Sequence, residues 1–173
     1  ELAAAIEACV QKAERYYTIM GFGSFAPGNA EGGLTTQEEK SMGAYSKSGS
    51  SIIDGILKPG DIPPTGGLYL LDVVPDGEPR FGFPNISDNA EIVEMIACGA
   101  HLTLFTTGRG SVVGSAISPV IKICANPDTA RRLAADMDVN AGRILEGAAS
   151  LEQVGAEIYD KVLAVAAGAR SVS

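Results

Sequence analysis

The sequence contains no tryptophan, a single histidine and only three cysteines in 173 residues. Cys9, Cys98 and Cys124 lie far apart, with neither a paired spacing nor a Cys/His cluster that would indicate a zinc site. Separated cysteines in odd number, among apolar neighbours, predict reduced and buried thiols, as is typical of a cytoplasmic protein. We expect His101 in the turn between a helix and a strand, where a structural hydrogen bond is favoured over acid–base chemistry.

Basic residues are also scarce, because 13 Lys and Arg stand against 21 Asp and Glu, for a net charge of −8. No basic stripe is present to neutralise phosphates, which argues against a nucleic-acid partner. No apolar run reaches membrane-spanning length, and the opening residues lack the pattern of a signal peptide. We therefore expect neither a nucleic-acid partner nor a membrane partner.

Hydrophobic residues make up 46% of the chain and glycine occurs 21 times, which suits a real core connected by many tight turns. This length predicts that residues 1–173 form a single domain. The chain opens inside a helical pattern and without a methionine, since Leu2, Ile6 and Cys9 follow a 3.6-residue period. We expect it to be a piece of a longer protein.

Hydrophobic periodicity predicts helices that alternate with buried strands. Helices are expected at residues 1–20, 35–47, 52–57, 88–98, 127–136 and 150–168, and strands at residues 67–74, 102–107 and 119–125. Three pairs have the spacing of helix caps: Thr35 with Glu38, Asp88 with Glu91, and Ser150 with Gln153. Alternating strands and helices predict an α/β fold with a mainly parallel sheet and helices on both faces, a three-layer, Rossmann-like arrangement.

The chain is organised around a short apolar strand that ends in a polar, glycine-rich turn. The turn contains Thr106, Thr107, Gly108, Arg109, Gly110 and Ser111. Ligands collect at the carboxyl ends of parallel strands, glycines let backbone N–H groups approach an anion, and guanidinium forks suit carboxylates or phosphates. The pattern predicts an anion-binding turn, with a structural ion pair of Arg109 as the alternative. Gly114 comes one position too late for a dinucleotide fingerprint.

A second polar cluster, Asn29-Ala-Glu-Gly-Gly-Leu-Thr-Thr36, leads into an expected helix. Backbone N–H groups at a helix N-terminus favour anions, so Gly32, Gly33 and Thr35 are candidate substrate-binding residues. Glu31 is a candidate metal ligand or catalytic carboxylate. Helix capping alone would also explain Thr35.

Three charged residues stand in apolar or turn segments. Lys122, alone in the strand at 119–125, must be paired, point to a cleft, or face water on an edge strand. Its charge could stabilise a carboxylate or an enolate, or it could act as a base. Asp138, with Asn140, offers oxygen ligands to a hard divalent ion, although an Asx-type turn also explains this pair. Asp72, deep in a strand, requires a partner.

Four segments then occur in a recognisable order. They are Gly28-Asn-Ala-Glu-Gly-Gly-Leu-Thr-Thr-Gln-Glu-Glu-Lys-Ser-Met-Gly43, Phe105-Thr-Thr-Gly-Arg-Gly-Ser111, Pro119-Val-Ile-Lys-Ile123 and Met137-Asp-Val-Asn-Ala-Gly142. Together they resemble the C-terminal portion of the altronate dehydratase and galactarate dehydratase family, from about residue 27 to residue 147. Members of this family are longer, so the resemblance implies N-terminal domains of the same enzyme as partners.

The resemblance implies a hydro-lyase that dehydrates a sugar acid to a 2-keto-3-deoxy acid, assisted by a divalent metal, Fe²⁺ or Mn²⁺. In this picture the turn around Arg109 holds the carboxylate of a small anionic sugar acid. Lys122 supports the developing negative charge. Glu31 is the first choice for a metal or hydroxyl contact, and Asp138 is a weaker metal candidate. Assembly into a homo-oligomer is left open.

The segment between Asp72 and Ile92 is longer than the sugar-acid dehydratases lead us to expect, so altronate or galactarate is not assumed as the substrate. Large subunits that resemble this family act as lyases on sulfolactate and expel sulfite in place of water. A non-catalytic module, which binds an acidic metabolite or fixes a partner domain, is the other alternative. Because no complete set of acid, base and metal is evident, we expect this chain alone to be inactive.

Overall fold

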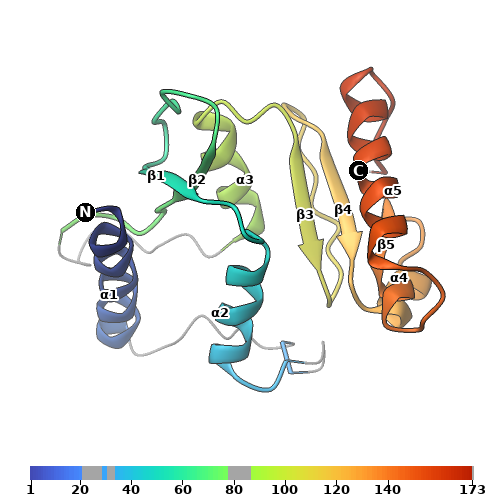
Figure 1. Ribbon diagram of the computed structural model, residues 1–173, viewed down its shortest axis with the longest axis horizontal. Coiled ribbons are helices and arrows are strands. Elements are labelled where there is room, and N and C mark those ends of the chain that lie inside the picture. The colour runs from blue at the N-terminus through green and yellow to red at the C-terminus, as the bar shows by residue number, and fades with distance from the viewer. Residues whose placement is uncertain (21–28, 31–33, 78–86, 173) are drawn as a thin grey trace. The chain divides into compact units, whose positions relative to one another are not determined.

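The computed structural model describes residues 1–20, 29–30, 34–77 and 87–172 (Figure 1). Its elements are α1 (Leu2–Met20), α2 (Gln37–Ser46), β1 (Ile53–Leu57), β2 (Leu68–Leu71), α3 (Asp88–Ala97), β3 (Thr103–Thr107), β4 (Val120–Cys124), α4 (Pro127–Arg132), β5 (Val139–Asn140), the 3₁₀ helix η2 (Ala141–Ile144) and α5 (Leu151–Ala166). Every strand pairing among them is parallel. The predicted α/β class is confirmed.

The described residues form two compact units, each with its own sheet. The first unit holds α1, α2, the two-stranded sheet β1-β2, and α3. The second unit holds Asn29, Ala30 and everything from His101 onward, including the sheet β3-β4-β5 and α5. None of the helices in the described ranges combines the length and the apolar character needed to cross a bilayer.

Strand β1 occupies residues that the sequence pattern assigned to a short helix, and that prediction was wrong. The apolar spacing around Ile53 and Leu57 fits a helical period, but β-branched residues also suit a pleated strand. Pairing with β2 decides between the two structures. Gly55 assists this pairing, because a Cβ at that position would lie 3.1 Å from the ring of Tyr69.

Two helix caps lie one residue away from the predicted positions. At α2 the hydroxyl Oγ1 of Thr36 accepts from the backbone N of Glu39 at 3.1 Å, and the Glu39 carboxylate accepts from the backbone N of Thr35 at 2.7 Å. At α3 the cap is Ser87, whose side chain accepts from the backbone N of Ala90. Neighbouring polar residues are equivalent as cap formers, so only the backbone path selects one of them. The capping box at the start of α5 is confirmed.

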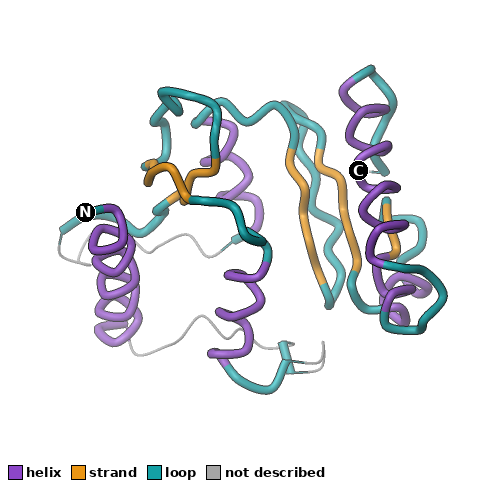
Figure 2. The backbone as a smooth tube through the Cα atoms, viewed as in Figure 1, coloured by secondary structure: helices purple, strands orange, loops and turns teal. Residues whose placement is uncertain are grey.

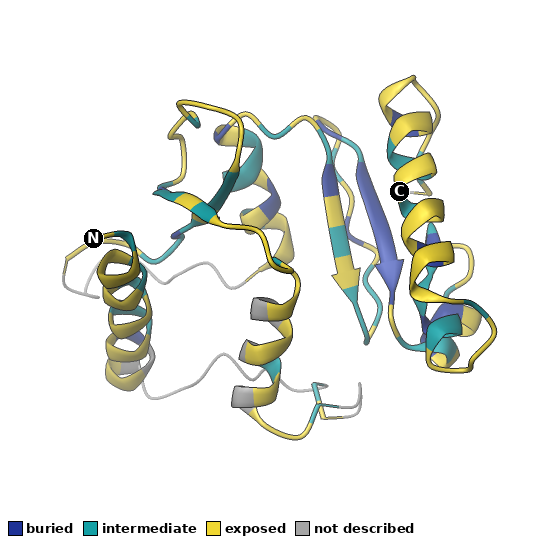
Figure 3. Ribbon diagram, in the orientation of Figure 1, coloured by how far each residue is buried: buried dark blue, intermediate teal, exposed yellow. Residues whose placement is uncertain are grey.

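The second unit has β4 at the centre of its sheet, and all five residues of β4 are buried (Figure 3). Ile121 and Ile123 face α5 and form a core with its buried residues Val154 and Val165. Successive side chains of a strand point to opposite faces, so Lys122 and Cys124 lie on the other face. There Cys124 packs with residues of the segment that includes α4.

Several boundaries in this unit differ from the prediction. Helix α4 ends at Arg132, earlier than the predicted residue 136, and the segment 137–142 forms strand β5 and the start of η2 where a polar turn was expected. Strand β5 has only two residues, too few to produce an alternating pattern in the sequence. All three cysteines are free thiols, as predicted; Cys98 and Cys124 are buried, whereas Cys9 is half-buried.

Candidate functional site

The predicted anion-binding turn, residues 106–111, lies at the carboxyl end of β3 in the second unit. Its backbone folds around Gly110, whose φ of 93° favours glycine. A Cβ at Gly110 would lie 2.4 Å from Cδ1 of Leu133 and 3.0 Å from Cγ2 of Thr129. Glycine is therefore required here both by the backbone conformation and by the close approach of α4 and the residue that follows it.

A second close approach joins two further segments at the same end of the sheet. A Cβ at Gly142 would lie 2.4 Å from the backbone N of Pro127, so η2 packs directly against the start of α4. The parallel register aligns the last residues of the three strands, Thr107, Cys124 and Asn140. Three segments that are distant in the sequence therefore converge where the three strands end.

Hydrogen bonds within the turn use some of the groups that were predicted to bind an anion. Oγ1 of Thr107 accepts from the backbone N of Gly110 at 2.9 Å, and Oγ of Ser111 accepts from the backbone N of Val113 at 3.1 Å. The N–H of Gly110 is thus already engaged. Thr106 and Arg109 are exposed, which makes the Arg109 side chain the cationic group that the turn presents to solvent.

Lys122 is 1% exposed, so the alternative of a water-facing lysine on an edge strand is wrong. Its ammonium Nζ donates to the carbonyl O of Val113 at 3.3 Å. Val113 belongs to the loop that runs from β3 back along the sheet to the start of β4 (Figure 2). The ammonium therefore lies beneath this loop, on the face of the sheet opposite α5.

The side chain of Asp138 is wholly buried and is surrounded by nitrogen donors. One carboxylate oxygen, Oδ2, accepts from the backbone N of Lys122 at 3.0 Å. The other, Oδ1, accepts from Nζ of Lys161 at 2.9 Å and from the backbone N of Val172 at 3.1 Å. Asp138 thus ties β4, α5 and the last described residues together, and a metal ion would have to displace these donors.

The divalent metal that the family resemblance implies stays a prediction. Within the described ranges, no group of three or more His, Cys, Asp and Glu side chains could hold a metal ion. Glu31, Gly32 and Gly33, which were predicted to bind metal or substrate, lie outside the described residues. Thr35 is exposed in the first unit, where its hydroxyl donates to the Glu39 carboxylate, as expected of a residue beside a helix cap.

The partner required for Asp72 is a pair of lysines in the first unit. Oδ2 of Asp72 accepts from Nζ of Lys12 at 2.6 Å and from Nζ of Lys58 at 2.8 Å, and Sγ of Cys9 donates to the same oxygen. Burial acts most strongly on the Asp72 carboxyl and raises its pKa, but these hydrogen bonds together outweigh burial and hold the pKa at about 2. Asp76, which is exposed, bridges the same two ammonium groups through Oδ1.

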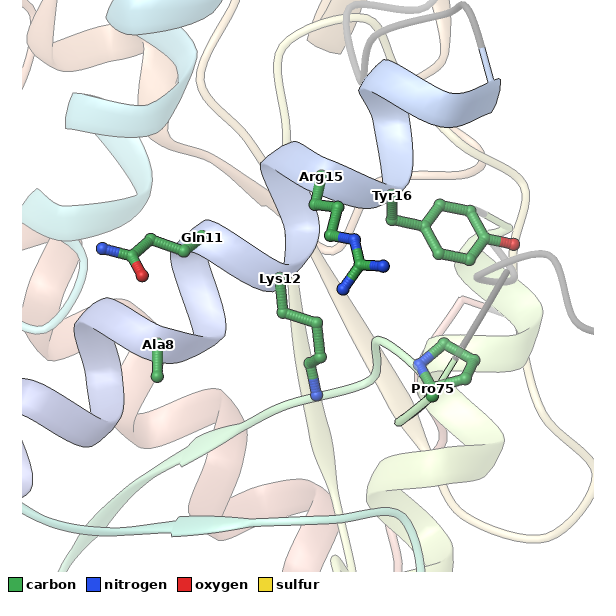
Figure 4. Close-up of a pocket in the computed structure, with 7 residues that line it drawn as sticks. Ala8, Gln11, Lys12, Arg15, Tyr16 and Pro75 are labelled. Carbon is green, nitrogen blue, oxygen red and sulfur yellow. The ribbon is translucent and has the colours of Figure 1, made fainter. Parts of the chain in front are cut away.

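A cavity of about 290 Å³ opens beside this cluster, and sequence reasoning did not find it. Lys12, Arg15 and Tyr16 of α1 line one side and Pro75 lies opposite (Figure 4). The spacing of Lys12, Arg15 and Tyr16 could have indicated it, because residues three and four positions apart share one face of a helix. The sequence does not reveal that this face of α1 meets the segment after β2.

Comparison with known proteins adds a functional context to this geometry. The family described as D-galactarate/altronate dehydratase, C-terminal, matches residues 1–173. The subunit beta of (2R)-sulfolactate sulfo-lyase from Chromohalobacter salexigens is 36% identical over 143 residues, which are 82% of this chain and 34% of that protein. Galactarate dehydratase (L-threo-forming) from Escherichia coli is also 36% identical over 143 residues, 83% of this chain and 25% of that enzyme.

Altronate dehydratase from Escherichia coli is 34% identical over 143 residues, which are 83% of this chain and 26% of that enzyme. The chain thus spans between 25% and 34% of the length of these three relatives. The matched region is 143 residues long in each relative, although their names describe different substrates.

Proposed function

The chain belongs to the D-galactarate/altronate dehydratase family, and on this premise we propose that it supplies the acid-binding part of a sugar-acid dehydratase. The observation that carries the proposal is the convergence of three separate segments at the carboxyl end of the sheet in the second unit. Gly110 and Gly142 are the points of closest approach. In parallel sheets this edge is where ligands bind.

The proposed reaction removes one molecule of water from a sugar acid and gives a 2-keto-3-deoxy acid. A base takes the proton next to the carboxylate, negative charge develops on the carboxylate side, and an acid assists the departure of the neighbouring hydroxyl. In our proposal Arg109, with the backbone N–H groups of Gly108 and Ser111, holds the substrate carboxylate. Thr106, Thr107 and Ser111 shape the turn that presents Arg109.

Lys122 is proposed to supply positive charge near the developing anion. Its support is the burial of the ammonium on the central strand, in the same sheet whose edge carries the turn. Roles for Glu31, Gly32, Gly33 and Thr35 at the substrate, and for Fe²⁺ or Mn²⁺, stay predictions of the family resemblance. No step of the proposed reaction is assigned to a metal.

A second candidate is the sulfo-lyase reaction, in which sulfite leaves in place of water. Its support is that the sulfolactate sulfo-lyase subunit and galactarate dehydratase are equally similar to this chain, at 36% identity over 143 residues each. Both reactions begin with an acid whose carboxylate must be held while a proton is removed. Arg109 therefore has the same role in either case.

The test measures product release by a protein that joins this chain to the upstream domains of its relatives, with ferrous or manganous ion present. Release of a keto acid from galactarate or altronate indicates dehydration, whereas sulfite release from sulfolactate indicates the second candidate. The Arg109→Ala variant is expected to lose about 2–4 kcal/mol of transition-state binding, the scale of one preorganised charge contact. Arg170→Ala removes an exposed arginine near the end of the chain and serves as the matched control.

Two outcomes would contradict the proposal. An unchanged turnover in Arg109→Ala would make this arginine structural. Release of neither product from any of the three acids would favour a non-catalytic module. The chain alone is expected to be inactive, and full activity without the upstream domains would show that the site does not need them.

A further inference from the structure

The ammonium of Lys122 is buried with most of its hydrogen-bonding capacity unused. An ammonium has three N–H donors, and burying one without a counter-charge is costly in free energy. It donates to the carbonyl O of Val113, and no carboxylate in the described part of the chain pairs with it. Two donors of a wholly buried charge therefore have no protein acceptor there.

Two hydroxyl groups nearby are in the same condition. Oγ1 of Thr103 and Oγ of Ser118 are buried and have no hydrogen-bond partner among the residues that the structure describes, and their residues are 4% and 5% exposed. Buried hydroxyls in proteins are normally satisfied by protein or water, so each unsatisfied one needs an explanation. Both belong to the second unit, at the end of the sheet where β3 and β4 begin.

The strand register places Thr103 and Lys122 on one face of the sheet. Thr103 pairs with Val120, and Lys122 follows Val120 by two residues, so all three side chains point to the same side. Two residues along a strand cover roughly 7 Å, which the four-carbon stem of a lysine can span. Ser118 lies two residues before Val120, just ahead of the strand. This face is the one opposite the α5 core.

The segment that covers this face, residues 111–118, is held by local hydrogen bonds. Oγ of Ser111 bonds the backbone N of Val113, and Oγ of Ser115 accepts from the backbone N of Ile117 and of Ser118. These bonds would move with the segment if it lifted. The bond between Lys122 and Val113, by contrast, joins the segment to the sheet.

We propose that Lys122, Thr103 and Ser118 form an oxyanion-binding subsite beneath residues 111–118. An entering oxyanion accepts from the ammonium and from both hydroxyls, and takes the place of the Val113 carbonyl as the acceptor for Lys122. The covering segment then lifts from the sheet, and the buried charge gains the counter-charge that it lacks. The subsite itself stands on geometry, whereas its occupation by a second acidic group of a substrate, other than the carboxylate held at Arg109, rests on the proposed function.

Calorimetric titration of this chain tests the subsite without requiring catalysis. The probes are galactarate, the neutral polyol galactitol, which has the same carbon skeleton without charge, and inorganic sulfite. We expect galactarate or sulfite to bind and galactitol not to bind. Binding of both anions, or of galactarate alone, assigns the subsite to a substrate carboxylate, whereas binding of sulfite alone assigns it to a free inorganic anion.

The variants separate the subsite from general attraction to positive charge. Lys122→Met, which keeps the length of the side chain, is expected to weaken anion binding by at least about tenfold, the effect of losing one charged hydrogen-bond donor. Lys47→Met removes an exposed lysine and should leave the affinity unchanged. Thr103→Val keeps the shape of its side chain and should weaken binding by about threefold, the smaller effect of a neutral donor.

Hydrogen exchange on the unaltered chain gives a second measurement that needs no variant. Anion binding is expected to speed amide exchange in residues 111–118, because the segment lifts. Equal affinity in Lys122→Met and the unaltered chain, equal binding of galactitol, or no anion binding at all would overturn the proposal. If the joined protein binds the anion but releases no product, the result would count against the proposed function and not against the subsite.

Discussion

Asp72 in the first unit and Lys122 in the second unit are both buried charged side chains, and their surroundings treat the charge in opposite ways. The Asp72 side chain is 3% exposed and is bonded by the ammonium groups of Lys12 and Lys58. Lys122 is 1% exposed and is bonded by the carbonyl of Val113. A carboxylate with two cationic partners has little capacity left for a ligand. A buried ammonium with one neutral acceptor still has most of its capacity.

The contrast separates a structural charge from one that is available for function. Removing one partner of a buried ion pair leaves the other charge unpaired, which is strongly destabilising. Replacing a buried charge that has no counter-charge by an apolar side chain removes a desolvation cost. The same kind of experiment, neutralising one buried charge, should therefore give opposite results in the two units.

The largest effect is expected for Asp72→Asn. This variant removes the buried negative charge shared by Lys12 and Lys58 and leaves them the exposed Asp76 as a counter-charge, so the free energy of unfolding should fall by about 3 kcal/mol. Urea unfolding followed by circular dichroism measures the loss. Asp76→Asn is the control, because Asp76 contacts the same lysines but is 76% exposed, and should cost less than ~1 kcal/mol. An equal loss of unfolding free energy in both variants would show that burial of the carboxylate does not decide its contribution to stability.

Lowering the pH should neutralise the Asp72 carboxylate and so reduce the stability of the folded chain. The Asp72 pKa is about 2 in the folded chain against 3.8 ordinarily, so the unfolded state binds more protons between these values. The ion pairs therefore contribute fully above about pH 4, and their contribution, about 2 kcal/mol, is lost as the pH falls toward 2. Unfolding of the original chain and of Asp72→Asn across this range measures it. If stability depended on pH identically in the two proteins, the loss could not be attributed to Asp72.

The smallest effect on stability is expected for Lys122→Met in the second unit. The variant removes one long hydrogen bond to Val113 but also removes a buried charge, so the free energy of unfolding should change by less than ~1 kcal/mol or rise. The urea unfolding used for Asp72→Asn allows direct comparison. A loss as large as that of Asp72→Asn would mean that Lys122 is structural, and would erase the contrast between the two units.

Local signals in the sequence predicted much of the second unit. The apolar run of β3, the Asn126-Pro127 start of α4 and the capping box of α5 each depend on residues close together in the chain, and each is confirmed. The same kind of reasoning failed at β1, whose apolar spacing fits a helix as well as a strand. There the pairing with β2, a contact between distant segments, decides the outcome.

Within the candidate site, local signals located the turn but not its contacts. The glycine-rich turn after β3 could be located because its two glycines lie close together in the chain, and Gly110 has a positive φ of 93°. The engagement of its N–H by Thr107 depends on the path of the backbone and could not be inferred. The burial of Asp138 among nitrogen donors, where a metal ligand was considered, was equally hidden.

By itself, the amino-acid sequence determined the alternation of strands and helices, the position of the glycine-rich turn and the family. Hydrophobic periodicity, the placement of glycines and the order of the motifs are properties of the sequence, so they can be recognised without the fold. Only the tertiary structure decided that Asp72 is paired with two cations while Lys122 is enclosed under a loop with a single carbonyl. That distinction depends on which distant segments flank each strand, because both residues are charged side chains within apolar runs.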